Sequence, residues 1–240
     1  MSSAAAPVAG ASEALAAFAV VEHAGEGFVE AFRTAEARLA AAGAVLVSPR
    51  DTAERAKIAL ASNAAVLRRA FVAATALASV DAMREDAAII GAALAAAEIA
   101  PYDDRAPAEA IAVGREVAAR MRGAIEFDAP WDVEAIADRI GAAAGAARLF
   151  GLDAGQARHA LGLAATQAAG LGVAEPVSAG YLTRGKAAFD AVEGAALARA
   201  GFTSAPAALE GRRGLIALMA HGSAEALIQG LGTHWLSVVS

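Results

Sequence analysis

The chain has 240 residues, of which 58% are hydrophobic and only 5% aromatic, and its formal net charge is −6. Much of the hydrophobic content is alanine, the residue with the highest helix propensity, and no long alternating Val/Ile/Thr/Tyr run predicts a strand, so we expect an all-α protein. The negative charge and the lack of a basic stripe argue against a nucleic-acid partner. The absence of cysteine excludes disulfides, thiolate nucleophiles and Cys–zinc sites.

Neither a membrane segment nor a targeting segment is expected. The longest uncharged runs, such as Ala160–Ala174, are shorter than the roughly 20 residues that a spanning helix needs. No basic region precedes an apolar stretch near the N-terminus, so we expect no signal peptide and a cytoplasmic protein.

Residues 1–11 are small and unpatterned and are expected to form a flexible N-terminus, whereas residues 12–240 are expected to form a single all-helical domain. Gly, Pro and turn residues separate the helical patterns. In chain order, helices are predicted at 13–21, 27–42, 52–81, 87–97, 107–122, 131–150, 153 to the Gly-rich run that begins at 170, 183–201, 211–221 and 224–230.

Several residues specify how these helices begin, end and pack. Asp153 and Gln156 have the spacing of a capping box, which predicts a helix start. Gly201 is suited to the left-handed position that follows a helix. Gly141 and Gly145 lie four residues apart on one face, which favours a close helix crossing. Gly43 is expected to end the second helix.

Four segments resemble one family, and they occur in its order. They are AAIIGAALAAAE at 87–98, AIAVGREVAARM at 110–121, and stretches within 143–171 and 185–214 that contain AARLFGLDAGQARHALGLAATQAAGL and GKAAFDAVEGAALARAGFTSAPAALEGRRG. The chain is similar here to the MmgE/PrpD family, which includes 2-methylcitrate dehydratase and cis-aconitate decarboxylase. The resemblance extends over roughly residues 52–235.

The resemblance implies an all-helical domain that is followed in the family by an α/β lid domain, with the active site between them and dimerisation through the helical part. This chain ends near the position where the lid would begin. We therefore expect the helical domain without the lid, acting as a homodimer or with a partner subunit that supplies the opposite wall of the site.

The family's first motif contains a His, then an Asp, then a pair of Asp residues. The resemblance places Ala78 at the His and Asp81 at the first Asp. Met83 and Arg84 stand at the Asp pair, and Trp131 lies near the position of a later family histidine. Only Asp81 therefore keeps the residue type of the family.

A second family motif, Thr-Lys-Arg-x-His-x-Gly, corresponds to residues 180–185. Thr183 stands at its His, while Arg184 and Lys186 remain as nearby cations. Family chemistry removes a proton beside a carboxylate and needs cations to hold the carboxylates. The resemblance thus implies a site without metal or cofactor that consists of catalytic Asp81 and substrate-binding Arg84, Trp131, Tyr181, Thr183, Arg184 and Lys186.

Each candidate also has a purely structural interpretation. Asp81 can be a helix-terminal surface residue, and Arg84 with its acidic neighbours can be a solvated charge cluster. Arg184 and Lys186 are expected in or before the first turn of a helix, where the dipole disfavours cations, so their presence favours anion binding. Trp131 either closes the pocket or packs at the surface. His159 is expected to be structural, and no His or acid spacing indicates a metal site.

Three functions remain open. The first is a divergent lyase or isomerase-type enzyme that acts on a small organic acid or a biosynthetic intermediate, in an apolar cleft that includes Met83, Phe127, Trp131 and Tyr181. The second is a non-catalytic pseudoenzyme that binds or regulates a partner. The third is a structural helical homodimer, which an alanine-rich surface with few charges would favour.

Overall fold

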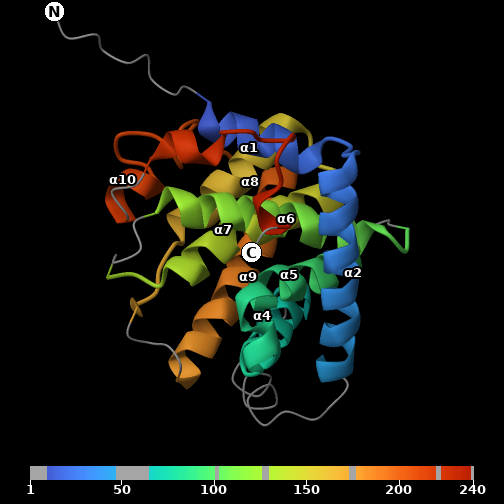
Figure 1. The fold of residues 1–240 in the computed structure, drawn as a ribbon. Helices are drawn as coiled ribbons and strands as arrows, with labels where there is room; N and C mark the ends of the chain where they lie inside the picture. The colour runs from blue at the N-terminus through green and yellow to red at the C-terminus, as the bar shows by residue number, and fades with distance from the viewer. Residues whose placement is uncertain are drawn as a thin grey trace, which may run out of the picture.

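The structure is a computed structural model that describes residues 10–46, 65–100, 103–125, 130–172, 177–219 and 223–238. Within these ranges the ordered elements are helical, and they pack around one another in several orientations (Figure 1). The only pairing of strand type in these ranges is an isolated bridge between Trp131 and Leu171. The prediction of an all-α fold is confirmed.

The elements have the following bounds. They are α1 (Ala11–Val20), α2 (Glu26–Leu46), α4 (Ala65–Ala78), the 3-10 helix η1 (Asp81–Asp86), α5 (Ala87–Ala97), α6 (Ala106–Ala124), α7 (Val133–Leu149), α8 (Ala154–Thr166), α9 (Ser178–Arg199), α10 (Leu215–Met219), η3 (Ala224–Leu227) and η4 (Leu236–Val238). None of the helices in the described ranges has both the length and the apolar character to cross a membrane.

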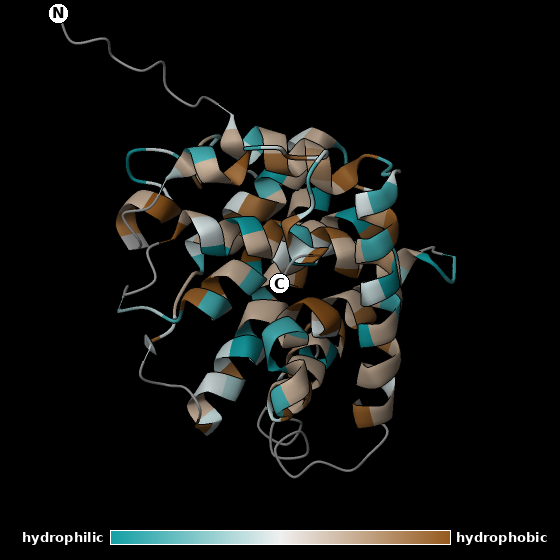
Figure 2. Ribbon diagram, in the orientation of Figure 1, coloured by the Kyte–Doolittle hydropathy of each residue, from teal (hydrophilic) through white to brown (hydrophobic). Residues whose placement is uncertain are grey.

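Helix α5 lies at the centre of the core. Its sequence AAIIGAALAAA contains no polar side chain, and all of its residues except Leu94 are buried. It packs against α4, α6, α7 and α9, so it needs no polar face. Helix α2, by contrast, stands at one side of the molecule with hydrophilic and hydrophobic segments alternating along it, as expected for a helix with one solvent-exposed face (Figure 2).

Glycine permits the closest approach between helices, at the α6–α7 crossing. A Cβ atom on Gly141 would lie 2.3 Å from the carbonyl oxygen of Gly114, and one on Gly145 would lie 2.8 Å from that of Ala110. Any side chain would therefore force the two backbones apart. The close crossing predicted from Gly141 and Gly145 is confirmed.

The predicted caps are also present. Asp153 accepts a hydrogen bond from the backbone N–H of Gln156, whose side chain accepts one from the backbone N–H of Asp153, which completes the capping box at the start of α8. Gly201 has φ of +89°, and it follows α9 as predicted. Phe202 then donates a backbone hydrogen bond to Leu197, which closes the end of the helix.

Several predicted boundaries were wrong. Helix α2 continues through Gly43, because a glycine in an exposed helix costs only about 1 kcal/mol and nothing within 4 Å opposes it. The helix predicted to start near Thr183 begins five residues earlier, at Ser178. In α9 the backbone at Gly185 packs closely against Phe71 and Thr75 of α4, so tertiary contact outweighs the low helix propensity of glycine.

The remaining differences concern helix ends. The helix predicted over 52–81 has its start outside the described residues, and its described part ends at Ala78. Of the described residues in the predicted 211–221 helix, which end at residue 219, Leu215–Met219 is α-helical, and Ala224–Leu227 is a 3-10 helix. The predicted flexible segment 1–11 lies almost entirely outside the described residues, because the description begins at residue 10.

Candidate functional site

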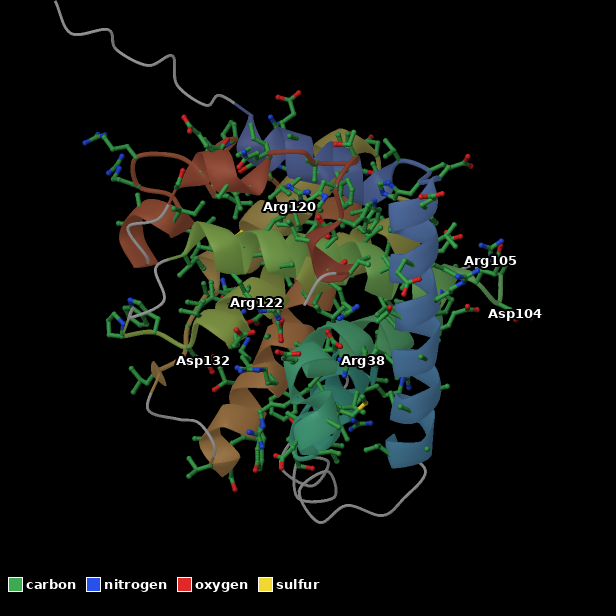
Figure 3. The ribbon with its side chains drawn as sticks, in the orientation of Figure 1. Arg38, Asp104, Arg105, Arg120, Arg122 and Asp132 are labelled. Atoms are coloured by element: carbon green, nitrogen blue, oxygen red, sulfur yellow. The ribbon has the colours of Figure 1, made fainter. Side chains whose placement is uncertain are left out.

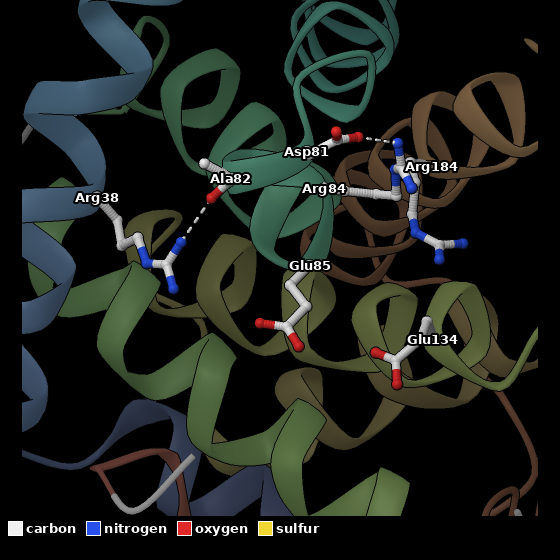
Figure 4. A pocket seen from close by; sticks show the side chains of 7 residues that line it. All are labelled: Arg38, Asp81, Ala82, Arg84, Glu85, Glu134 and Arg184. Atoms are coloured by element: carbon white, nitrogen blue, oxygen red, sulfur yellow. Dashed lines mark hydrogen bonds and ion pairs between the residues drawn. The ribbon is translucent and has the colours of Figure 1, made fainter. Parts of the chain in front are cut away.

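A charged pocket lies where η1 joins α4 to α5, and we call it the η1 pocket (Figure 4). Its volume is about 610 Å³. It is lined by Arg38 from α2, by Asp81, Ala82, Arg84 and Glu85 from η1, by Glu134 from α7 and by Arg184 from α9. The pocket therefore brings together Asp81, Arg84 and Arg184 of the residues expected from the sequence.

The tight geometry of η1 places Asp81 and Arg84 together. In a 3-10 helix, side chains three residues apart lie on one face. The Arg84 Nη2 atom lies 2.5 Å from Asp81 Oδ1, and the guanidinium carbon lies 5.6 Å from the centre of the Tyr181 ring on α9. The Asp81 side chain is 92% exposed, so its carboxylate is open to solvent and to any molecule entering the pocket.

Two ion pairs hold η1 against its neighbours. Asp86 is buried at the end of η1 and lies 3.2 Å from Arg38 Nε and 3.0 Å from Arg115 Nε. Arg38 also donates a hydrogen bond of 2.8 Å from Nη1 to the carbonyl oxygen of Ala82 (Figure 4). These contacts fix the turn that carries Asp81 and Arg84. Asp86 is thus a buried structural carboxylate and not part of a solvated charge cluster.

Arg184 is a buried residue rather than a cation at a helix start. It is the seventh residue of α9, and its side chain is 1% exposed. Its Nη1 atom donates a 2.7 Å hydrogen bond to Asp132, the residue that caps α7 through the backbone N–H of Ala135. The expectation that Arg184 and Lys186 lie in or before the first turn of the helix was wrong, because α9 starts at Ser178.

A second carboxylate, Asp138, lies behind the pocket. It is fully buried, and Arg122 Nη2 lies 2.7 Å from its Oδ1 atom while Arg184 Nε lies 3.9 Å from its Oδ2 atom. Arg122 also pairs with Glu134 at the pocket wall. Burial raises the pKa of Asp138 well above its ordinary value despite the nearby guanidinium groups. Asp132, Glu134 and Asp138 thus share two arginines, Arg122 and Arg184.

The other expected residues, Trp131, Tyr181, Thr183 and Lys186, do not line the pocket. Lys186 pairs with Asp190 one turn further along α9, and its Nζ atom lies 4.7 Å from the centre of the Phe189 ring. The hydroxyl of Thr183 donates to the carbonyl of Ala179 in its own helix. Trp131 is half-buried and forms the backbone bridge to Leu171.

This pocket is not the expected apolar cleft, because every lining residue that the structure describes, except Ala82, is charged. Met83 is buried in the core, and Phe127 lies outside the described residues. A larger cavity of about 850 Å³ between α2, α4 and α5 is mainly aliphatic, with Leu39, Val72 and Leu94 among its lining residues. None of the expected site residues lines it.

The described histidines have structural roles or lie away from the pocket. His159 Nδ1 accepts a hydrogen bond of 3.1 Å from the backbone N–H of Ser204, which ties α8 to the loop after α9. His23 packs against Phe18 and Trp235. Among the described residues, no group of three or more His, Cys, Asp or Glu side chains is arranged to hold a metal ion.

Residues that reach this region from distant elements have no signal in the sequence, with one exception. Arg38 and Glu134 carry no motif, and only the packing of α2 and α7 brings them to the η1 pocket (Figure 4). Asp138 carries no motif either, and it lies beside Arg122 and Arg184. Asp132 did have a detectable signal, because an Asp immediately before a helical pattern is a preferred N-cap residue. In Figure 3, Asp104 and Arg105 lie apart from this region on a projecting loop.

Comparison with known proteins identifies the family. The family model for the MmgE/PrpD N-terminal domain matches residues 80–227, which is more than half of the chain and extends from the start of η1 through α9 to η3. A search of curated proteins found no match. The matched segment includes the part of the η1 pocket formed by η1, α7 and α9. This chain belongs to the MmgE/PrpD family, through the N-terminal domain of that family.

Proposed function

We propose that this protein is a divergent lyase or isomerase-type member of its family that binds a small organic acid, such as a biosynthetic intermediate, in the η1 pocket. The observation that carries the proposal is the convergence of Asp81, Arg84 and Arg184 on one cavity. These three residues were expected at the site from the family resemblance. They come from η1 and α9, which are far apart in the sequence. A pocket of about 610 Å³ is within the size range of small-molecule sites.

Arg84 is the group best suited to hold a carboxylate of the ligand. Its guanidinium faces the pocket from η1 and is paired with an exposed carboxylate, Asp81, which a ligand carboxylate can displace. Arg184 has a structural role in the pocket wall, because its charge is already compensated by Asp132 and Asp138.

Asp81 is the candidate acid or base. A reaction of the proposed class removes a proton from the carbon beside a carboxylate, and the group that leaves accepts a proton. Displacement of Arg84 from Asp81 by the ligand would leave the Asp81 carboxylate beside the bound molecule. Glu85 and Glu134 are the other carboxylates that line the pocket and could exchange the second proton.

The alternative is a pseudoenzyme that binds or regulates without catalysis. The exposure of Asp81 favours it, because an exposed carboxylate paired with arginine lacks the enclosed environment of most catalytic acids. The family's histidines are replaced by other residues in this chain, such as Ala78 and Thr183, and this also favours a pseudoenzyme.

The proposal includes a second subunit, either another copy of this chain or a different protein, that covers the pocket. It places the protein in the cytoplasm and requires no metal or cofactor. Apolar side chains near the start of α9 support such a cover. Leu171, Val177 and Leu182 are each about half exposed or more, and Leu182 adjoins Tyr181, the residue that contacts Arg84.

Binding of organic acids and its dependence on Arg84 test the proposal. Calorimetric titration with a panel of mono-, di- and tricarboxylates and amino acids should identify at least one ligand. Arg84→Gln should weaken its binding about ten-fold or more, the usual effect of losing a charge-assisted hydrogen bond. Arg213→Gln, at an exposed position outside the pocket, is the control and should leave the affinity unchanged.

Catalysis is tested separately. NMR spectra of the bound acid in D₂O should show deuterium exchange or product formation, and Asp81→Asn should abolish this while the helical circular dichroism spectrum is retained. Binding without exchange or product would support the pseudoenzyme. A complete absence of Arg84-dependent binding across the panel would contradict the proposed function.

A further inference from the structure

The charges that line the η1 pocket are balanced. Three arginines face three carboxylates, and Ala82 is the only neutral residue among the seven described lining residues. A site that selects a di- or tricarboxylate needs surplus positive charge, because each carboxylate that enters must exchange its water for cationic or hydrogen-bonding partners. The balance therefore disfavours a polyanionic ligand.

The buried charges behind the pocket do not supply the missing surplus. Arg184 is paired with Asp132, and Arg38 is paired with Asp86. Arg122 is paired with Glu134 at the wall. Each of these arginines therefore has its charge compensated inside the protein, so little of it remains for a ligand.

Two lining residues retain capacity to bind. Glu85 is exposed, and no ion pair or hydrogen bond joins its carboxylate to any described residue. Within the described part of the chain, Arg84 donates hydrogen bonds through Nε and Nη2 only, and its charge partner is the exposed Asp81. The pocket thus offers a ligand the Glu85 carboxylate, which has no partner among the described residues, and the Arg84 guanidinium, whose only described charge partner is the exposed Asp81.

These two groups point in different directions although they are neighbours in the chain. Figure 4 shows Arg84 extending toward Arg184 on α9, while Glu85 extends toward the α7 side of the cavity. A ligand that contacts both must therefore span the cavity, with opposite charges at its two ends.

We propose that the η1 pocket selects a small zwitterion, whose ammonium group binds Glu85 and whose carboxylate binds Arg84, over a dicarboxylate of the same length. This inference rests on the proposed function, since it names the substrate class of the same site. It gives this protein a ligand of zero net charge, matched to a pocket of zero net charge.

The test compares probes that differ in charge and not in length. ω-Amino acids from 3-aminopropanoate to 6-aminohexanoate are titrated calorimetrically at low salt, beside diacids and diamines with the same number of carbons. At the best length the amino acid should bind about ten-fold more tightly than the diacid or the diamine, the effect expected for one unmatched charge. The best length measures the separation between the two binding groups.

Substitutions at Glu85 then identify the site, and they should leave the fold intact because the side chain is exposed. Glu85→Gln should remove the preference for the amino acid over the diacid. Glu85→Lys adds positive charge and should reverse the preference, so that the diacid binds more tightly. Glu22→Gln, an exposed glutamate between α1 and α2, is the control and should retain the parent preference.

The possible outcomes separate the two claims. A diacid that binds as tightly as the amino acid in an Arg84-dependent manner overturns the zwitterion inference and leaves the proposed function standing. The zwitterion inference alone also fails if Glu85→Lys leaves the preference unchanged. If neither class binds, while the wider panel of organic acids also fails, the proposed function is overturned as well.

Discussion

At the scale of single residues, the unusual feature of this alanine-rich protein is its set of buried charges. Arg120, Arg139 and Arg184 are almost completely buried, and each contacts a carboxylate. A buried charge is tolerated only with a partner, and removal of one partner costs several kcal/mol. Two of the three arginines lie on the α7 and α9 helices that form the wall of the η1 pocket, so these pairs help to determine its shape.

Asp138 gives a prediction about pH. Because burial raises its pKa in the folded state, the folded protein retains a proton that the unfolded chain releases once the pH exceeds the ordinary value of 3.8. The parent protein therefore loses unfolding free energy as the pH rises from this value toward the raised pKa. Asp138→Asn mimics the protonated carboxyl and abolishes this loss. The unfolding free energy of the variant minus that of the parent should therefore be larger at pH 7 than at pH 4.

The measurement is urea unfolding of both proteins at a series of pH values. Asp190→Asn is the matched control, since Asp190 is equally buried and pairs with Arg139 and Lys186. Its loss leaves Arg139 without that partner and should cost about 3–5 kcal/mol. A difference between Asp138→Asn and the parent that stays constant from pH 4 to pH 7 would show that Asp138 is ionised in the folded protein.

At the scale of elements, the pocket depends on how closely the helices approach one another. Gly185 of α9 lies against Thr75 and Phe71 of α4, and Gly91 of α5 lies against Ala74 of α4. These contacts fix the position of α4, and therefore of η1 at its end, relative to α9, which forms one wall of the pocket. Small residues are thus a requirement of the site geometry and not merely a consequence of alanine-rich composition.

Gly141 tests this requirement at the α6–α7 crossing. In Gly141→Ala the new methyl group would lie 2.3 Å from the carbonyl oxygen of Gly114, so the helices must separate. We expect a loss of about 1–3 kcal/mol in unfolding free energy. Gly43→Ala is the opposite case, because nothing lies within 4 Å of its Cβ position in the exposed part of α2, and it should gain about 0.5–1 kcal/mol. Thermal unfolding of both variants gives the comparison, and equal effects would refute the close-packing argument.

At the scale of the whole molecule, segments on both sides of the family match pack together. The match begins at residue 80 and ends at residue 227. Trp235, beyond it, packs against Phe18 and Phe28, which lie before it. Arg120 of α6 reaches this region as well, and it donates hydrogen bonds to the carbonyl oxygens of Gln229 and His234 (Figure 3). The described N-terminal and C-terminal segments therefore form one structural unit on the outside of α6.

Trp235→Ala tests this coupling. Trp235 is 5% exposed, and its loss should cost about 3–5 kcal/mol, as for other buried aromatic residues. Hydrogen exchange should accelerate in α1 and at the start of α2 as well as around the substitution, because Phe18 and Phe28 lose a shared partner. Phe202→Ala removes an aromatic residue that is 57% exposed and should change little. Faster exchange confined to the C-terminal segment would contradict the coupling.

Local chemistry made part of the fold predictable. The capping box at Asp153 and the glycine at 201 act within a few residues, and the central α5 sequence has no polar side chain to place in water. These features predicted the all-helical class and several helix ends from the amino-acid order. The ordered segments that resemble the MmgE/PrpD family predicted the ancestry, and they led to Asp81, Arg84 and Arg184.

Long-range packing decided the rest. Nothing near Arg38 in the sequence indicates that it clamps η1, and the burial of Arg184 depends on where α9 begins relative to α4 and α7. The expected apolar cleft proved to be a charge-balanced pocket because Glu134 and Arg38 arrive from other helices. Helix formation depends mainly on residues that are close in the sequence, so the sequence by itself determined which segments form helices. The electrostatics of a pocket depend on side chains separated by many residues, and only the tertiary structure brings those side chains together.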